Sequence, residues 1–81
     1  AYNGFNLDYQ VDQLHKMLNS KTGKHYPITN QRPLIEQRLK EGFTLYDFEK
    51  AIDYLIQHQQ EISLNDLIVH LPDYLNKINS N

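Results

Sequence analysis

The chain has 81 residues, enough for one small domain close to the size at which a single hydrophobic core only just offsets the entropy of the chain. It contains no cysteine, which excludes disulfides and thiolate metal sites, so apolar side chains must provide its stability. No apolar run approaches the roughly 18 residues of a membrane span, and the first residues lack the basic-then-apolar order of a signal peptide. These features predict a soluble intracellular protein.

The net charge of -2 is divided unevenly along the chain. Residues 13–40 carry six basic residues and one acidic residue, a net charge of +5, whereas the remainder carries two basic and nine acidic residues, a net charge of -7. This distribution is typical either of a domain with an anion-binding face opposite an acidic one, or of ordinary charged helix surfaces.

Apolar residues at spacings of three and four predict a first helix that begins near residues 8–9 and ends near residues 19–20. Residues 1–8 are therefore expected to form an N-terminal arm. The apolar face of this helix comprises Val11, Leu14, Met17 and Leu18.

A basic segment with one glycine and one proline, residues 21–29, is expected to form the next loop. Gly23 is suited to a positive φ after the helix, and Pro27 keeps the preceding residues extended, so that Tyr26 and Ile28 pack on the domain. A phosphate-binding Walker loop needs a second glycine and a preceding strand, and the segment has neither. We therefore expect no bound nucleotide here.

A second helix is expected to begin at Asn30, to hold Pro33 in its first turn and to end at Gly42. Its apolar residues are Leu34, Ile35 and Leu39.

The third helix has the clearest start. Thr44 and Asp47 form the pattern of a capping box, Phe43 and Phe48 flank the turn as a hydrophobic staple, and the periodicity extends to about Gln57. The stripe that is expected to face the core comprises Leu45, Phe48, Ile52, Leu55 and Ile56. The residues that face away are Tyr46, Glu49, Lys50 and Asp53.

Ser63 and Asp66 repeat the capping pattern, and Pro72 is expected to break the following helix near His70 and to start a last one. No residues alternate in the way a strand requires, so the sequence predicts an all-α fold, a small compact bundle of four to five helices. The residues expected in its core are Leu14, Leu18, Leu34, Leu39, Phe43, Phe48, Ile52, Leu55, Leu67 and Leu71.

The sequence offers no motif for catalysis or for a metal. Its four histidines lack metal-ligand spacing, and its serines and threonines lie at caps, in the basic loop or at the tail rather than in a nucleophile motif. We therefore expect no enzymatic activity, no metal and no cofactor. The second and third helices around Gly42 also fit a helix-turn-helix, but the outward face of the third is acidic on balance and would repel DNA phosphates.

Residues 18–55, "LNSKTGKHYPITNQRPLIEQRLKEGFTLYDFEKAIDYL", resemble the C-terminal domain of phage replisome organisers. The shared motifs, in order, are Leu18-Asn19, Lys21 to Lys24, Tyr26, Leu34-Ile35, Arg38 to Phe43, Thr44-Leu45, Asp47-Phe48 and Lys50 to Asp53. The last part departs from the family pattern, because it has no Trp and no Arg-Pro, and only Tyr74 to Asn76 is similar. The DNA-binding region that precedes this domain in the organisers is missing. The chain is thus either an excised domain or a small stand-alone relative.

The resemblance implies a non-enzymatic role in starting phage DNA replication in the cytoplasm of a bacterial host. The partner that the resemblance implies first is a replication protein, such as the host helicase loader or helicase, and the second is single- or double-stranded DNA. No membrane or small-molecule substrate is expected. The alternatives are a helical regulator that blocks a host protein and a helix-turn-helix DNA-binding domain.

Two sets of surface residues are candidates for these contacts. One set is basic and would bind nucleic acid or a partner protein if the loop folds back over the start of the second helix. Arg38 is left out of this set, because it is expected to pair with a carboxylate such as Asp47. The basic set comprises Lys16, Lys21, Lys24, His25, Tyr26, Arg32 and Lys40. The alternative partner face comprises Tyr46, Glu49, Lys50 and Asp53.

Overall fold

The computed structural model describes residues 4–80 and shows five α-helices and one short 3-10 helix. In chain order these are α1 (Gly4–Thr22), the 3-10 helix η1 (Thr29–Gln31), α2 (Arg32–Lys40), α3 (Leu45–Gln57), α4 (Leu64–Val69) and α5 (Leu71–Asn79). No strand occurs among the described residues, so the predicted all-α bundle is confirmed. No helix between residues 4 and 80 combines the length and the apolar character that crossing a bilayer requires.

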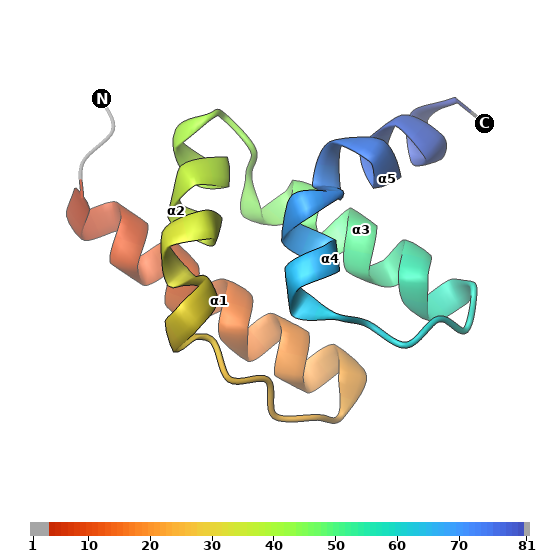
Figure 1. The fold of residues 1–81 in the computed structure, drawn as a ribbon, viewed down its shortest axis with the longest axis horizontal. Coiled ribbons are helices and arrows are strands. Elements are labelled where there is room, and N and C mark those ends of the chain that lie inside the picture. Colours follow the sequence, from red (N-terminus) through yellow and green to blue (C-terminus); the bar gives the residue numbers. More distant parts are fainter. Residues whose placement is uncertain (1–3, 81) are drawn as a thin grey trace.

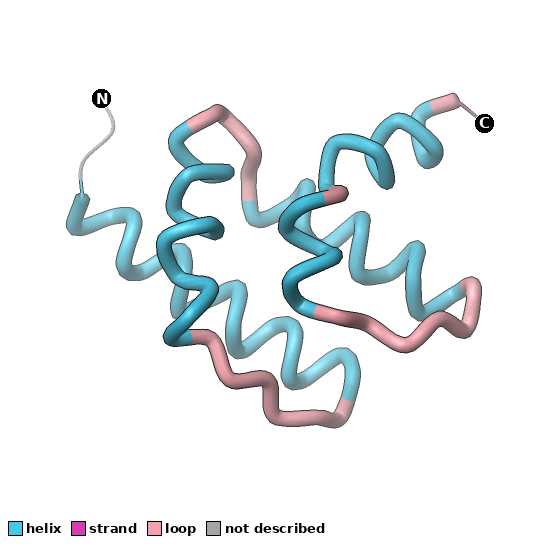
Figure 2. Tube along the Cα trace, viewed as in Figure 1, coloured by secondary structure: helices cyan, strands magenta, loops and turns pink. Residues whose placement is uncertain are grey.

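The helices form two layers (Figures 1 and 2). α1 and α3 lie at the back of the view, and α2, α4 and α5 lie in front of them. The domain is 17 Å thick along its shortest axis, which agrees with two helices packed face to face. α2 packs on α1, α5 packs on α3, and α4 contacts both α2 and α5.

The core lies between these layers and consists entirely of apolar side chains. α1 contributes one stripe at spacings of three and four, and Phe48 is the largest side chain that is fully buried. The buried residues are Leu7, Val11, Leu14, Leu18, Ile35, Leu39, Phe48, Ala51, Ile52, Leu55, Ile62, Leu64, Leu67, Ile68, Leu71 and Leu75. Met17, Tyr26, Ile28 and Phe43 are partly buried and pack against this core.

Four positions that were predicted to face the core are wrong or only partly right. Leu45, at the start of α3, is only partly buried. Leu34 is 39% exposed, because Ile35 and Leu39, four residues apart, already define the buried side of α2. Ile56 is 41% exposed, since Leu55 fills the core position on the last turn of α3. Phe43 is partly buried at the edge of the core, with the Arg38 guanidinium 5.7 Å from its ring centre.

α1 is longer than predicted at both ends. It begins at Gly4, so residues 4–8 of the expected arm are helical, whereas residues 1–3 of that arm lie outside the described part of the chain. Leu7 extends the apolar stripe and is buried, which explains the earlier start. At the other end Thr22 donates its hydroxyl proton to the carbonyl oxygen of Leu18 at 2.7 Å, and Gly23 follows with a φ of +71°, the positive φ predicted for it.

The start of α2 also differs from the prediction. Asn30 lies inside the 3-10 helix rather than at a cap, and α2 begins at Arg32 after Gln31, whose side chain makes no capping hydrogen bond. Pro33 lies in the first turn, as predicted. The helix is followed by Gly42 with a φ of +107°, which confirms the predicted stop.

The remaining predicted boundaries are confirmed. Thr44 and Asp47 form a complete capping box, with N–H···O distances of 3.1 Å to the Thr44 hydroxyl and 2.9 Å to the Asp47 carboxylate. Ser63 accepts a hydrogen bond from the backbone N–H of Asp66 at 3.3 Å at the start of α4. The chain breaks at His70 between α4 and α5, with Pro72 in the first turn of α5.

Candidate functional site

The basic loop is anchored to the domain through Tyr26. Its backbone N–H donates to the side-chain oxygen of Asn19 at 2.9 Å, and its phenolic O–H donates to the carbonyl oxygen of Ile62 at 2.9 Å. The Nε2–H of His15 donates to the carbonyl oxygen of Tyr26 at 2.6 Å. Tyr26 is therefore a fixed, partly buried link between two loops, whereas its neighbour His25 is exposed.

Two lysines, Lys21 in the last turn of α1 and Lys24 in the loop that follows, make ion pairs within the domain. Lys21 Nζ lies 2.8 Å from a carboxylate oxygen of Asp53 and 3.3 Å from one of Glu49, both on α3. The hydrogen bond to Asp53 is the main cause that raises the pKa of Lys21 above its ordinary value of 10.5. Lys24 Nζ lies 3.6 Å from a carboxylate oxygen of Glu61.

Arg32 joins the start of α2 to the first half of α1. Its guanidinium lies 2.9 Å from a carboxylate oxygen of Asp12 and 3.5 Å from one of Asp8. Glu36, one turn further along α2, is 4.0 Å away. Three carboxylates thus surround one cation, so the immediate surroundings of Arg32 are acidic on balance.

Arg38 is structural, as expected, but its partners differ from the predicted Asp47. Its Nε–H and Nη2–H donate to the carbonyl oxygens of Ile68 and Val69 at 3.0 and 2.9 Å, which caps the C-terminal end of α4. Its Nη1 lies 2.8 Å from Glu41. Asp47 is unavailable for this pairing because it closes the capping box of α3.

The basic candidate residues are spread over the domain. Arg32 pairs with Asp12 on α1, and Lys21 lies nine residues further along the same helix. Nine residues correspond to about 14 Å along the helix axis, so Arg32 and Lys21 are well separated. Lys16 and Lys40 are exposed, and within residues 4–80 neither makes an ion pair. The structure thus commits Lys21, Lys24 and Arg32 to carboxylates of the same chain rather than to one open cationic surface.

The alternative face on α3 remains at the surface. Tyr46 is 65% exposed, with the Lys50 ammonium 4.9 Å from its ring centre. Lys50 also lies 3.8 Å from Asp47. Glu49 and Asp53 turn toward α1, where they share Lys21, and we call these three residues the α1–α3 seam.

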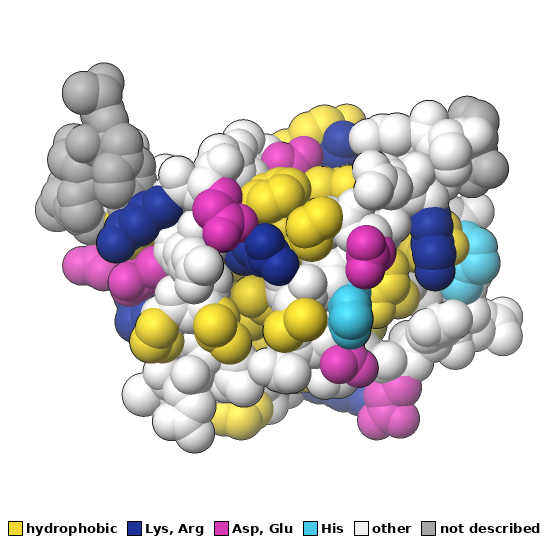
Figure 3. Space-filling model, turned by 45° about the horizontal axis from the view of Figure 1, so that its top comes forward, with side chains coloured by type: hydrophobic (Ala, Val, Ile, Leu, Met, Phe, Trp, Pro, Cys, Tyr) yellow, Lys and Arg dark blue, Asp and Glu magenta, His cyan; other side chains and the backbone are white. Residues whose placement is uncertain are grey.

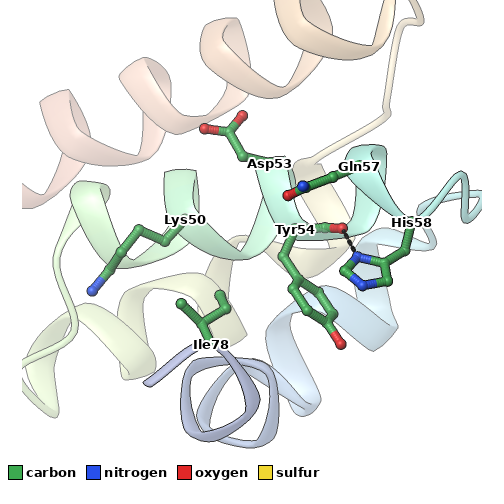
Figure 4. A pocket seen from close by; sticks show the side chains of 6 residues that line it. All are labelled: Lys50, Asp53, Tyr54, Gln57, His58 and Ile78. Carbon is green, nitrogen blue, oxygen red and sulfur yellow. Dashed lines mark hydrogen bonds between the residues drawn. The ribbon is translucent and has the colours of Figure 1, made fainter. Parts of the chain in front are cut away.

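A groove of about 470 Å³ lies beside this face, between α3 and α5 (Figure 4). We call it the α3–α5 groove; it is lined by Lys50, Asp53, Tyr54, Gln57, His58 and Ile78. Figure 4 shows the Tyr54 ring pointing from α3 toward α5, with Ile78 of α5 beside it and Asp53 on the opposite side of α3, toward α1.

Aromatic rings hold the wall of the α3–α5 groove in place. The Nδ1–H of His58 donates to the carbonyl oxygen of Tyr54 at 2.8 Å, and the two ring centres are 4.1 Å apart. The ring of Tyr74 on α5 lies 6.3 Å from that of Tyr54, and burial raises the pKa of Tyr74 above its ordinary value of 10.0. The sequence analysis missed Tyr54 and His58, although Lys50, Tyr54 and His58 follow one another at spacings of four, which places all three on one side of the helix.

A second surface lies between α2 and α4, on the face shown in Figure 3, where hydrophobic side chains gather among charged ones. Leu34 and Val69 are 39% and 44% exposed there. This α2–α4 patch encloses a shallow hollow of about 150 Å³ lined by Leu34, Gln37, Arg38, Ile68 and Val69. The one charged residue in this lining, Arg38, forms an ion pair with Glu41.

Among residues 4–80, no three histidine, aspartate or glutamate side chains gather closely enough to hold a metal ion.

Comparison with known proteins relates the chain to phages. The family described as "Conserved phage C-terminus" matches residues 14–68, from the middle of α1 into α4. No curated protein and no solved structure matches the chain. The family match covers more than half of the 81 residues, so the chain belongs to the conserved phage C-terminus family.

Proposed function

We propose that this chain is a non-enzymatic accessory module of phage DNA replication that binds a replication protein of the bacterial host, such as the helicase loader or the helicase. Membership of a phage family and the resemblance of residues 18–55 to replisome organisers support this role. The observation that favours a protein over DNA is the internal pairing of the basic residues.

DNA binding draws most of its free energy from lysines and arginines that neutralise phosphates and release counterions. Here Lys21 has two carboxylate partners within 3.3 Å, and Arg32 has two within 3.5 Å. To reach a phosphate, each of them would have to leave these carboxylates, which would then repel the DNA. With a net charge of -2 for the whole chain, a protein partner fits this surface better.

Two binding measurements on the same purified protein test the proposal. Biolayer interferometry against the purified host helicase and helicase loader is expected to give saturable binding to one of them. Fluorescence anisotropy with single- and double-stranded oligonucleotides is expected to show no change at tens of micromolar protein in low salt. DNA binding that weakens steeply with salt, without binding to either protein, would overturn the proposal.

A helicase assay then separates recruitment from inhibition. A module that recruits the helicase is expected to increase unwinding of a forked substrate when tethered to it through a DNA-binding domain. A regulator that blocks a host protein would instead lower the unwinding rate as its concentration rises, without any tether.

A further inference from the structure

We infer that the α2–α4 patch is a self-association surface, through which two copies of the chain form a weak symmetric dimer. The inference goes beyond the proposed function and does not depend on it. It assigns an occupant to an exposed apolar surface that the core of the domain does not use.

The patch exposes aliphatic side chains that the fold does not need. Ile35 and Leu39 already form the buried side of α2, and Leu34 beside them is 39% exposed. Val69, at the end of α4, is 44% exposed, and Leu34 and Val69 line the same hollow of about 150 Å³. Figure 3 shows hydrophobic side chains gathered on this face. Apolar side chains that gather on a surface are typical of an interaction site, because covering them removes apolar area from water.

A surface that binds its own copy has to be complementary to itself. In a dimer with two-fold symmetry each patch meets the same patch, so an uncompensated charge meets a like charge. Among the described residues that line the hollow, only Arg38 is charged, and its Nη1 lies 2.8 Å from a carboxylate oxygen of Glu41. Its other donors bind the carbonyl oxygens of Ile68 and Val69. The charge of Arg38 is thus compensated within one copy, and the patch does not repel a second one.

The polar groups of the patch also match those of a second copy. Gln37 is exposed and lies one turn after Leu34 on α2, in the lining of the hollow. Its side-chain amide has donors and an acceptor, so two such amides bond to each other across a two-fold axis. A two-fold axis that reverses α2 against its copy also sets the two Arg38–Glu41 pairs in opposite directions, which brings opposite charges together. Aliphatic, amide and ionic groups therefore each find their complement in the same patch.

The other large apolar side chains that residues 4–80 expose lie beside charges that a second copy would repel. Ile56 lines a hollow with Lys21, which two carboxylates share. The ring of Tyr46 has the Lys50 ammonium 4.9 Å from its centre. Tyr9 is flanked on α1 by two aspartates that pair with one arginine. The balance of charge therefore selects the α2–α4 patch as the surface that meets its own copy.

The small size of the patch predicts weak, reversible association. Interfaces below about 1,200 Å² are typical of transient complexes, so we expect a dissociation constant on the order of hundreds of micromolar. Sedimentation equilibrium from about 10 µM to about 1 mM protein is expected to show an average mass that rises from the monomer toward the dimer. A monomer over the whole range would contradict the inference.

Two variants with opposite charges test whether the patch meets itself. Leu34→Lys and Leu34→Glu are each expected to remain monomeric, because the added charge meets its own copy in the dimer. An equal mixture of the two is expected to associate at least about tenfold more tightly than either variant alone. Circular dichroism checks that both variants fold.

The control makes the same two changes at Ile56, which is 41% exposed, close to the 39% of Leu34. Ile56→Lys and Ile56→Glu should each self-associate within about twofold of the wild type. Loss of association through the Ile56 variants, or a mixture of the Leu34 variants that associates no better than its components, would exclude the α2–α4 patch.

NMR on a mixture of labelled and unlabelled protein locates the contact. Nuclear Overhauser effects between molecules are expected among the methyl groups of Leu34 and Val69. Added salt should leave the association unchanged or strengthen it slightly, since it screens the repulsion between two chains of net charge -2. Contacts from Tyr46 or Ile56, or association that disappears in salt, would assign the dimer to another surface.

The inference and the proposed function can fail separately. If the helicase or loader binds and the chain stays monomeric, the dimer is wrong and the function stands. If the chain dimerises through Leu34 but binds neither protein, the function is wrong and the dimer stands. If the chain stays monomeric and Leu34→Glu weakens binding to the helicase or loader, the patch binds the host protein and the dimer is wrong.

Discussion

The segment from Lys21 to Glu41 and the outward side of α3 use their polar side chains in different ways. In the first, Lys21, Arg32 and Arg38 reach partners that are 32, 20 and 30 positions away in the sequence, and so they join separate helices. In the second, Tyr46 and Ile56 remain exposed, and Glu49 and Asp53 carry more charge than the one lysine they share. The most recognisable part of the sequence therefore stabilises the fold, and binding is to be sought on the surface that the fold leaves unused.

The comparison requires that the buried side of α3 contribute far more to stability than its exposed side. Phe48→Ala removes the largest fully buried side chain and is expected to cost about 3 to 5 kcal/mol, enough to unfold a domain of this size. Tyr46→Ala, on the exposed side of the same helix, should change the unfolding free energy by less than about 0.5 kcal/mol. Thermal melts followed by circular dichroism measure both. Equal melting temperatures for Phe48→Ala and wild type would refute the assignment of the core.

If the basic segment is structural, removing its best-connected side chain must destabilise the domain. Arg38→Met deletes two hydrogen bonds to the end of α4 and the ion pair with Glu41, and we expect a loss of about 2 kcal/mol in urea unfolding. Lys40→Met is the control, since Lys40 is exposed and makes no ion pair within residues 4–80. Similar, small effects of the two changes would mean that Arg38 does not hold α4.

The two capping residues test how much the local sequence stabilises the starts of α3 and α4. Thr44→Ala and Ser63→Ala each remove a hydroxyl that accepts a backbone N–H, and each is expected to lower stability by about 1 kcal/mol. Chemical denaturation of the two variants beside wild type measures this loss. A change at only one of the two sites would show that the other helix start depends on tertiary packing instead.

The smallest expected effect concerns the α1–α3 seam, where the two regions meet. Because the pKa of Lys21 is raised on folding, its ion pairs stabilise the domain fully below the unfolded pKa near 10.5 and lose this contribution as the pH rises through the higher folded value. Lys21→Met should therefore be slightly less stable than wild type at neutral pH, and the difference should vanish in strongly alkaline solution. Urea midpoints over this pH range test the expectation, with Lys16→Met as the control. If Lys21→Met remained less stable than wild type at high pH, the loss would come from packing of the aliphatic part of the Lys21 side chain and not from its ion pairs.

Features set by neighbouring residues were predictable from the sequence. The capping box at Thr44, the stop at Gly42 and the break before Pro72 each depend on a few adjacent side chains, and all three occur as expected. The rotation of α2 was not predictable, because a helix of nine residues with adjacent Leu34 and Ile35 leaves two orientations that bury similar apolar surface. Only contact with the other helices selects Ile35 for the core.

The candidate site was less predictable than the fold. The basic residues stand out in the sequence, but their carboxylate partners lie on other helices, so the neutralisation of Lys21 and Arg32 becomes visible only in three dimensions. The α3–α5 groove likewise requires Ile78 from α5 to lie opposite Tyr54. The face of α3 itself was predicted, because the helical period alone determines which of its residues point outward.

The capping of α4 by Arg38 has a consequence for the order in which the chain folds. With six residues, α4 is far below the length of about 12 to 15 residues at which an isolated helix becomes stable in water. Its last carbonyl groups depend on a side chain 30 residues upstream, so α4 gains its end contact only after α2 has docked. The C-terminal part of the domain is thus expected to close late in folding and to open first in the native state. The amide hydrogens of α4 should then exchange with deuterated solvent faster than those at the centre of α3.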